Sequence, residues 1–179
     1  PSLGRVAAAD GRVIVASPGA QTEPALPGRA LAAGDLLTAE GDGELHVDLG
    51  EDRAIFDAGA VAALREPPGG GVEIDLRRGA LTARARPRFD RPELRVVTPA
   101  ATVEVKGTVF SVHVAGNGVA TVTVARGSVV VRDRADERNV VAVRAGRRLE
   151  VDWAHPEPAV VGVAPLARML SRVGLDPAE

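Results

Sequence analysis

The sequence lacks cysteine and has few aromatic residues, and both absences narrow the function. Without cysteine, the chain cannot form a disulfide framework, a thiolate zinc site or a cysteine nucleophile. Its 179 residues include three Phe, one Trp and no Tyr, which argues against stacking of nucleobases or sugars on aromatic rings. The 22 basic and 24 acidic residues give a net charge of −2, so the basic excess of a nucleic-acid binder is missing as well.

Long apolar runs are also missing. No stretch of about 18 apolar residues occurs, so we expect no direct membrane insertion within this segment. The chain begins at Pro1 without a charged and then apolar leader. We therefore expect it to be a piece of a longer protein, with any signal peptide or membrane anchor outside this piece.

What is present is a hydrophobic pattern of period two. Leu45, Val47 and Leu49 alternate with polar residues, as half-buried strands require. Glycines separate many of the alternating segments, which is typical of frequent turns. The pattern predicts an all-β fold of short strands. The same alternation recurs at Ile74 and Leu76, Val103 and Val105, Val112 and Val114, and Val122 and Val124.

A weak internal repeat indicates how the strands are joined. Residues 74–81 align with residues 122–129 as apolar, polar, apolar, two spacers, glycine, a small or polar residue and apolar, and residues 31–36 repeat the second half. Each copy predicts a strand, a tight glycine turn, at Gly79 or Gly127 in the two full copies, and a second strand. Because such hairpins are marginal alone, we expect a solenoid-like or rolled stack of short antiparallel strand pairs.

One predicted strand changes its phase. Apolar residues occupy odd positions at Val103 and Val105 and an even position at Phe110. A strand cannot change face without an extra residue, so we predict a β-bulge or sharp bend at Gly107-Thr108. Glycine fits there because a bulge often needs a positive φ.

Composition divides the chain into two parts. Residues 1–153 form the predicted β domain, in which segment 67–71 is either an exposed loop or a joint between subdomains. Residues 154–179 contain a Pro-rich connector and an amphipathic segment of about ten residues, which is too short to persist as a lone helix. We expect this C-terminal helix to dock on the β domain or on a missing segment. Its apolar face is formed by Leu166, Met169, Leu170 and Val173.

No constellation in the sequence supports catalysis, a cofactor or a metal. His46, His113 and His155 are far apart and lack metal-ligand spacing, and the first two fall on the polar phase of their strands and should face solvent. An acidic cluster lacks the spacing of a calcium loop, so loop solubility explains it better. We therefore predict a non-enzymatic protein. The cluster comprises Asp42, Glu44, Asp48, Glu51 and Asp52.

A locally basic stretch is the candidate partner surface. A strand face or an exposed hairpin carries such charges routinely, and the alternative is contact with an acidic protein partner. The stretch comprises Arg77, Arg78, Arg84, Arg86, Arg88 and Arg91.

Residues 96–112 and 124–131 resemble the signature of the FecR family. That signature is Thr-Pro, alternating valines, a basic residue, Gly-Thr-x-Phe-x-Val and a later Val-x-x-Gly-x-Val-x-Val, and further similarity extends from Gly4 to Val151. We interpret the matching residues as fold determinants. They are Thr98, Pro99, Val105, Lys106, Gly107, Thr108, Phe110, Val112 and Gly127.

The resemblance implies an extracytoplasmic, non-enzymatic β module of the periplasm or cell envelope, built as a solenoid-like stack. In the best-known members, the module follows a single transmembrane helix. It relays the occupancy of an outer-membrane siderophore transducer to a cytoplasmic sigma factor. The implied partner is a protein, either such a transducer or another envelope protein.

Two departures from the family bear on that role. Gly50-Glu51-Asp52 replaces the usual Asp-Gly-Ser turn, and the 26 residues after Trp153 are too few for the receptor-contacting domain of transducer-coupled regulators. Two hypotheses remain: the sensory part of a membrane-anchored regulator of sigma-factor signalling, or a structural or interaction module of a secreted or envelope-anchored protein without a sigma-factor link. A glycan-binding domain ranks below both because aromatic side chains are scarce.

Substitution of Phe110 tests the predicted strand phase. If the ring lies in the core, Phe110→Ala should lower the free energy of unfolding by about 3–5 kcal/mol, because it removes a buried ring and leaves a cavity. Denaturant unfolding measures the change. A loss below about 1 kcal/mol would show that the predicted phase is wrong.

Overall fold

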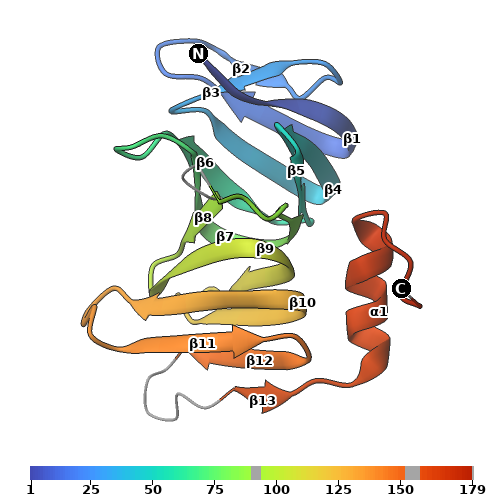
Figure 1. Ribbon diagram of the computed structural model, residues 1–179. Coiled ribbons are helices and arrows are strands. Elements are labelled where there is room, and N and C mark those ends of the chain that lie inside the picture. Colours follow the sequence, from blue (N-terminus) through green and yellow to red (C-terminus); the bar gives the residue numbers. More distant parts are fainter. Residues whose placement is uncertain (90–93, 152–157, 179) are drawn as a thin grey trace.

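The structure is a computed structural model and describes residues 1–89, 94–151 and 158–178. These residues form a 13-stranded sheet and a short C-terminal helix, and the strands follow one another from β1 and β2 at one end to β13 at the other (Figure 1). The elements are β1 (Ser2–Ala16), β2 (Thr22–Pro24), β3 (Ala30–Ala32), β4 (Leu36–Leu49), β5 (Asp52–Phe56), β6 (Val61–Arg65), β7 (Val72–Arg84), β8 (Leu94–Val97), β9 (Ala101–Val114), β10 (Ala120–Asp133), β11 (Val140–Arg144), β12 (Arg147–Val151), β13 (Ala159–Val160) and α1 (Val163–Arg172).

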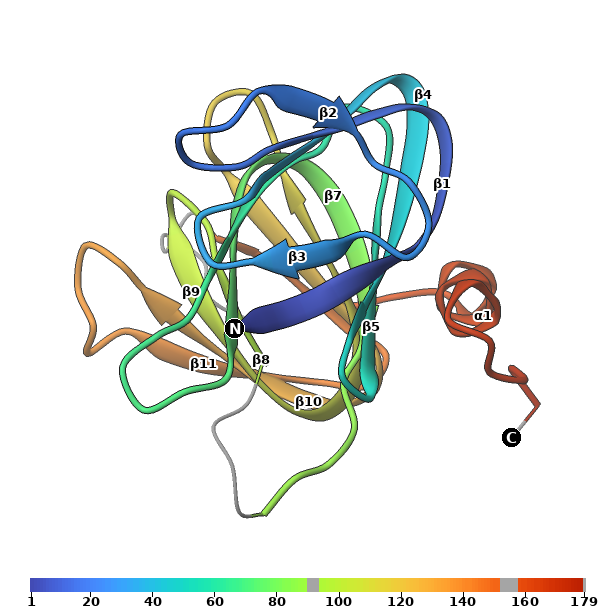
Figure 2. The ribbon, with the colours of Figure 1, turned by 90° about the horizontal axis from the view of Figure 1, so that it is seen from above.

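Long strands fold the sheet into two faces. The first half of β4 pairs with β6 and its second half with β5, and β10 divides in the same way between β12 and β11. We call the side that contains β5 and β12 face 1, and the side that contains β6, β8 and β11 face 2. Seen along the stack, the strands surround a common centre and α1 lies outside them (Figure 2).

The long strands bend at glycines. β7 continues through Gly79 and β10 through Gly127, with φ values of +81° and +79°. The hairpin turns predicted at these two positions are therefore wrong, because the chain bends there without reversing. A Cβ atom at Gly127 would lie 2.5 Å from the Gly107 carbonyl oxygen, and one at Gly79 would lie 2.5 Å from Ala60 Cα. Both the positive φ and the lack of space require glycine.

The bulge predicted at Gly107-Thr108 is confirmed. These two residues of β9 lie opposite Gly127 alone on β10, and Gly107 has a φ of +61°. The extra residue shifts the alternation so that both Val105 and Phe110 point into the core.

One apolar core lies between the two faces. It contains the predicted alternating residues, and Phe110 in it is completely buried. The prediction of a mostly β chain with one short C-terminal helix is confirmed. The solenoid-like stack is not, because the sheet closes around this core. Segment 67–71 lies in the loop between β6 and β7, which pair antiparallel, so the sheet continues across it.

The helix docks on the outer side of face 1. Leu170 and Val173 form a second apolar cluster with Ile55 and Val109 of the sheet. Of the predicted apolar face, Met169 is also buried, and Leu166 is only half-buried. In the described part of the chain, no helix has the length and apolar character needed to cross a membrane.

Two alanine substitutions separate the effects of positive φ and of crowding. Gly127→Ala should cost about 3 kcal/mol or more of unfolding free energy, because it adds a backbone clash to an unfavourable φ. Gly146→Ala is the matched control, since Gly146 has a φ of +80° and open space around its Cα. Its expected cost is about 1 kcal/mol, measured by denaturant unfolding. Equal costs would show that the close approach at Gly127 is unimportant.

Candidate interaction surface

Segment 85–89 follows β7 and passes beside the β9 bulge, where the sheet turns from face 1 to face 2. The Ala85 N–H donates to the Thr108 carbonyl at 2.9 Å, and the Thr108 N–H donates back at 3.0 Å. Pro87 packs on Gly107, where a Cβ atom would lie only 2.6 Å from Pro87 Cγ. Because glycine has no side chain, Pro87 can approach the backbone of Gly107 closely.

A buried carboxylate fixes the same segment. Asp52 is 5% exposed, its Oδ1 accepts the Arg86 N–H at 2.8 Å, and its Oδ2 lies 3.3 Å from the Arg88 guanidinium. Burial raises the pKa of Asp52, opposed by the Arg86 hydrogen bond and the Arg88 charge. Loop solubility is therefore the wrong explanation for Asp52. The sequence carries no local signal for this role, because the contacted residues lie more than 30 positions away.

The anchored segment presents an exposed aromatic ring. Phe89 is 100% exposed, whereas Phe56 and Phe110 are buried. Beside it lies a groove of about 710 Å³, whose lining includes Leu3, Pro87 and the turn between β4 and β5. Aromatic side chains, Phe among them, are enriched at protein interfaces, so the exposed ring makes this surface a candidate for partner contact.

Cross-strand pairing assembles arginines that are far apart in sequence. Arg5 pairs with Asp48, Asp48 with Arg53, and Arg53 with Arg84. Val109 then lies between Arg84 and Arg126. Residues that pair across neighbouring strands project to the same side of the sheet. The residues one position further along these strands on face 1 are buried in the core, so the row that contains these arginines points away from the core. We call it the arginine row; its basic members are Arg5, Arg53, Arg84 and Arg126.

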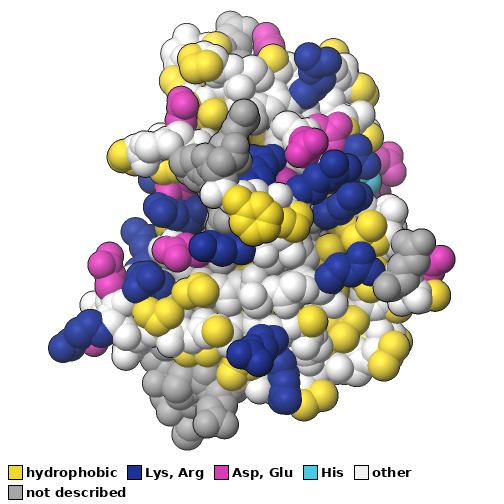
Figure 3. Space-filling view, in the orientation of Figure 1, with side chains coloured by type: hydrophobic (Ala, Val, Ile, Leu, Met, Phe, Trp, Pro, Cys, Tyr) yellow, Lys and Arg dark blue, Asp and Glu magenta, His cyan; other side chains and the backbone are white. Residues whose placement is uncertain are grey.

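The basic stretch found in the sequence is divided between the two faces. Arg77 and Arg78 precede the bend at Gly79 and lie on face 2, where Arg77 is 3.6 Å from Asp75. The other described members of the stretch lie together: Arg84 is on face 1, and Arg86 and Arg88 follow in segment 85–89. Arg91 lies outside the described residues. In the space-filling view, basic side chains gather around exposed hydrophobic ones across the middle of the face shown (Figure 3).

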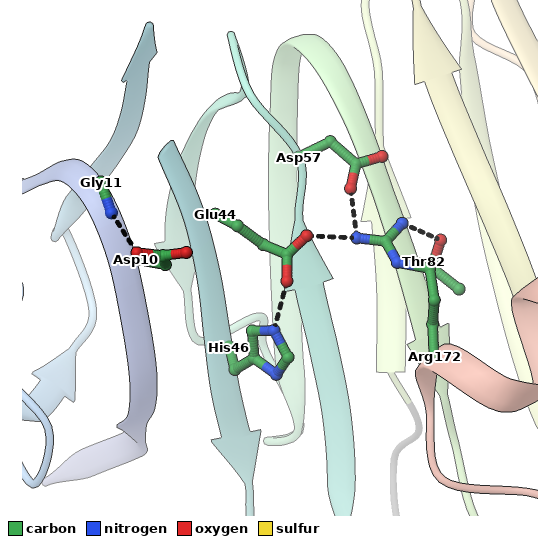
Figure 4. Close-up of polar contacts among 7 residues, drawn as sticks. All are labelled: Asp10, Gly11, Glu44, His46, Asp57, Thr82 and Arg172. Carbon is green, nitrogen blue, oxygen red and sulfur yellow. Dashed lines mark hydrogen bonds and ion pairs between the residues drawn. The ribbon is translucent and has the colours of Figure 1, made fainter. Parts of the chain in front are cut away.

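A polar cluster holds α1 against face 1. Arg172 donates to Glu44 Oε2 at 3.0 Å and also to Asp57 and Thr82 (Figure 4). His46 Nε2 lies 2.7 Å from Glu44 Oε1. The hydrogen bond from His46 lowers the pKa of Glu44, and the charge of Arg172 acts in the same direction. The cluster thus joins the last turn of the helix to β4, to β7 and to the residue that follows β5.

The histidines and acidic residues singled out in the sequence have different surroundings in the structure. His113 is exposed as predicted, whereas His46 is half-buried in the helix contact, and His155 lies outside the described residues. Glu44 belongs to that helix contact and Asp48 pairs with Arg53, so these two also differ from the predicted soluble loop. Among the residues with described positions, no group of three or more His, Cys, Asp or Glu could hold a metal ion.

Polar residues of the family motif stabilise turns and the bulge. The buried Thr98 Oγ1 accepts the Ala101 N–H at 3.0 Å, which closes the turn before β9, and Pro99 is exposed on that turn. The Thr108 hydroxyl donates to the Ser128 carbonyl at 2.7 Å across the bulge. Lys106 is exposed, and the apolar motif residues are in the core. The latter are Val105, Phe110 and Val112.

Asp52→Asn tests the buried carboxylate. A folded-state pKa above the unfolded value means that the folded protein binds the proton more tightly, so this contribution is present at low pH and lost as pH rises through the folded pKa. The unfolding free energy of wild type minus that of Asp52→Asn should therefore increase from about pH 7 to pH 4. Urea unfolding measures it, with Glu51→Gln as the exposed control. A difference independent of pH would contradict the prediction.

Comparisons with known proteins agree with the fold. Two crystal structures of a candidate anti-sigma factor from Parabacteroides distasonis each match with a TM-score of 0.55 and 20% identity, over 71% of this chain and 59% of that chain. This chain thus spans less than two thirds of that protein's length, and no curated protein matches it. A family model described as FecR protein matches residues 41–130, half of the chain. The chain therefore belongs to the FecR protein family.

Proposed function

We propose that this chain is an extracytoplasmic interaction and sensory module of a membrane-anchored regulator of sigma-factor signalling. Its membership of the FecR family supports the proposal, and so does the fold it shares with a candidate anti-sigma factor. The location in the periplasm or cell envelope is inferred from the family.

The observation that carries an interaction role is the exposure of Phe89 at the end of a hydrogen-bonded segment. A phenyl ring left in water forgoes about 1.5–3 kcal/mol of favourable burial free energy. Contact with a partner would recover that free energy, and the chain exposes this ring although it has only three Phe in all. Hydrogen bonds to Thr108 and Asp52 order the backbone at Ala85 and Arg86, at the start of the segment that ends in this ring. The cost of ordering that segment is then already met in the free protein.

The proposed mechanism is relay through protein contacts, without catalysis or a cofactor. A partner in the envelope, such as an outer-membrane transducer, would bind this surface by charge complementarity or add a strand to an edge of the sheet. Nucleic acid is not a proposed partner, because the net charge of −2 gives no general attraction to phosphates.

Deletion of the gene in its host tests the sigma-factor link. We expect a several-fold change in transcripts of one set of sigma-dependent promoters, because loss of the regulator alters how much sigma factor is free, and restoration by a plasmid copy. RNA sequencing measures the transcripts, and alkaline phosphatase fused to the C-terminus reports location, since that enzyme is active only outside the cytoplasm. Unchanged transcripts with an active fusion would instead support an envelope interaction module without a sigma-factor link.

A further inference from the structure

The arginine row carries more positive charge than its surroundings neutralise. Arg53 and Arg84 lie directly opposite each other, an arrangement in which like charges destabilise a sheet. The acidic member of the row, Asp48, lies 2.8 Å from Arg53. Two further carboxylates follow in the turn after β4 and at the start of β5: Glu51 pairs with Arg86, and Asp52 pairs with Arg88. In the described part of the chain, Arg84 is thus left without an ion pair.

A hollow lies at this uncompensated charge. It has a volume of about 320 Å³. Its lining includes Arg53, Arg84 and Arg86, the acidic residues Asp48, Glu51 and Asp52 that pair with neighbouring arginines, and Val173 just after α1. The hollow and the groove beside Phe89 share Gly50 and Glu51 of the turn between β4 and β5. Arg84, which has no ion pair among the described residues, and an exposed aromatic ring therefore lie near each other on one surface.

The apolar part of this surface favours a protein over a simple anion. Phosphate would pair with the guanidinium groups and leave Phe89 and the half-exposed Leu3 unused. Arginine and aromatic side chains together are enriched at the centres of protein interfaces. Carboxylates suit the site because guanidinium groups can bind them through two parallel hydrogen bonds.

We propose that the arginine row and Phe89 bind an acidic segment of a protein partner, with a carboxylate at Arg84 and an apolar side chain against Phe89. The inference rests on the proposed function in one respect, that the occupant is a protein partner in the envelope. Because charge attraction contributes to binding, the affinity should fall as the salt concentration rises.

Fluorescence anisotropy with a labelled peptide tests the proposal on the purified chain. The probe is a fluorescein-labelled peptide in which Glu alternates with Leu, and its control has Gln in place of every Glu. The Glu peptide should bind at least about tenfold more tightly than the Gln peptide, and Arg84→Glu should reduce that affinity about tenfold or more. Phe89→Ala should reduce it several-fold. Equal binding of the two peptides would overturn the proposal.

Matched variants separate the site from general charge and from misfolding. Arg78→Glu introduces the same charge change on the same strand but on face 2, and it should leave the affinity unchanged. Arg84→Gln removes the charge without adding repulsion and should still weaken binding, with circular dichroism confirming the fold. A loss with Arg78→Glu as large as that with Arg84→Glu would overturn the proposal. So would displacement of the peptide by millimolar inorganic phosphate combined with no effect of Phe89→Ala.

The outcomes distinguish this inference from the proposed function. If gene deletion changes sigma-dependent transcripts but peptide binding does not depend on Arg84, the proposed function stands and this surface assignment fails. If Arg84→Glu and Phe89→Ala abolish peptide binding but gene deletion leaves the transcripts unchanged, the surface stands and the sigma-factor link fails.

Discussion

Long strands of the sheet bend at crowded glycines, and these bends create the two faces that enclose the core. A straight strand of 13 residues would extend over about 40 Å and could cover only one side of a core. At Gly79 and Gly127 the backbone adopts a positive φ where neighbouring backbone leaves no room for a Cβ atom. Each strand can then contribute to both faces, and one apolar core fills the space between them.

The position of these bends also places the proposed interaction surface. Gly79 lies opposite Val114, whereas the Gly107 bulge lies beyond Val109, at the other end of the same paired segments. β7 therefore bends beside the end of β9, and β9 bends beside the end of β7. Segment 85–89 follows the end of β7 and passes beside the β9 bulge, and β8 afterwards pairs with β7 in parallel. Pro87 packs closely on Gly107, and Asp52 accepts a hydrogen bond from the backbone of the same segment, which ends in Phe89.

The sequence predicted those features that depend on near neighbours. Alternation identified the core valines, the phase change at Phe110 located the bulge, and the apolar spacing from Leu166 to Val173 located the helix. The internal repeat marks bends in continuing strands and not the predicted hairpins, because a glycine with positive φ can either reverse a chain or bend a strand. What decides between these outcomes is whether the flanking segments find partners on other strands, and a local motif does not contain that information.

The all-β class, the residues that face the core and the family resemblance can all be read from the sequence alone. These follow from local spacing, since side chains alternate along any strand. The long-range pairings bring Arg5, Arg53, Arg84 and Arg126 into one row. They also bury Asp52 as an anchor and separate Arg77 and Arg78 from the row. The row depends on the registers of six strands, and the Asp52 anchor depends on the segment that crosses beside them. Register is set by the packing of the whole sheet around its core, beyond what any single stretch of sequence specifies.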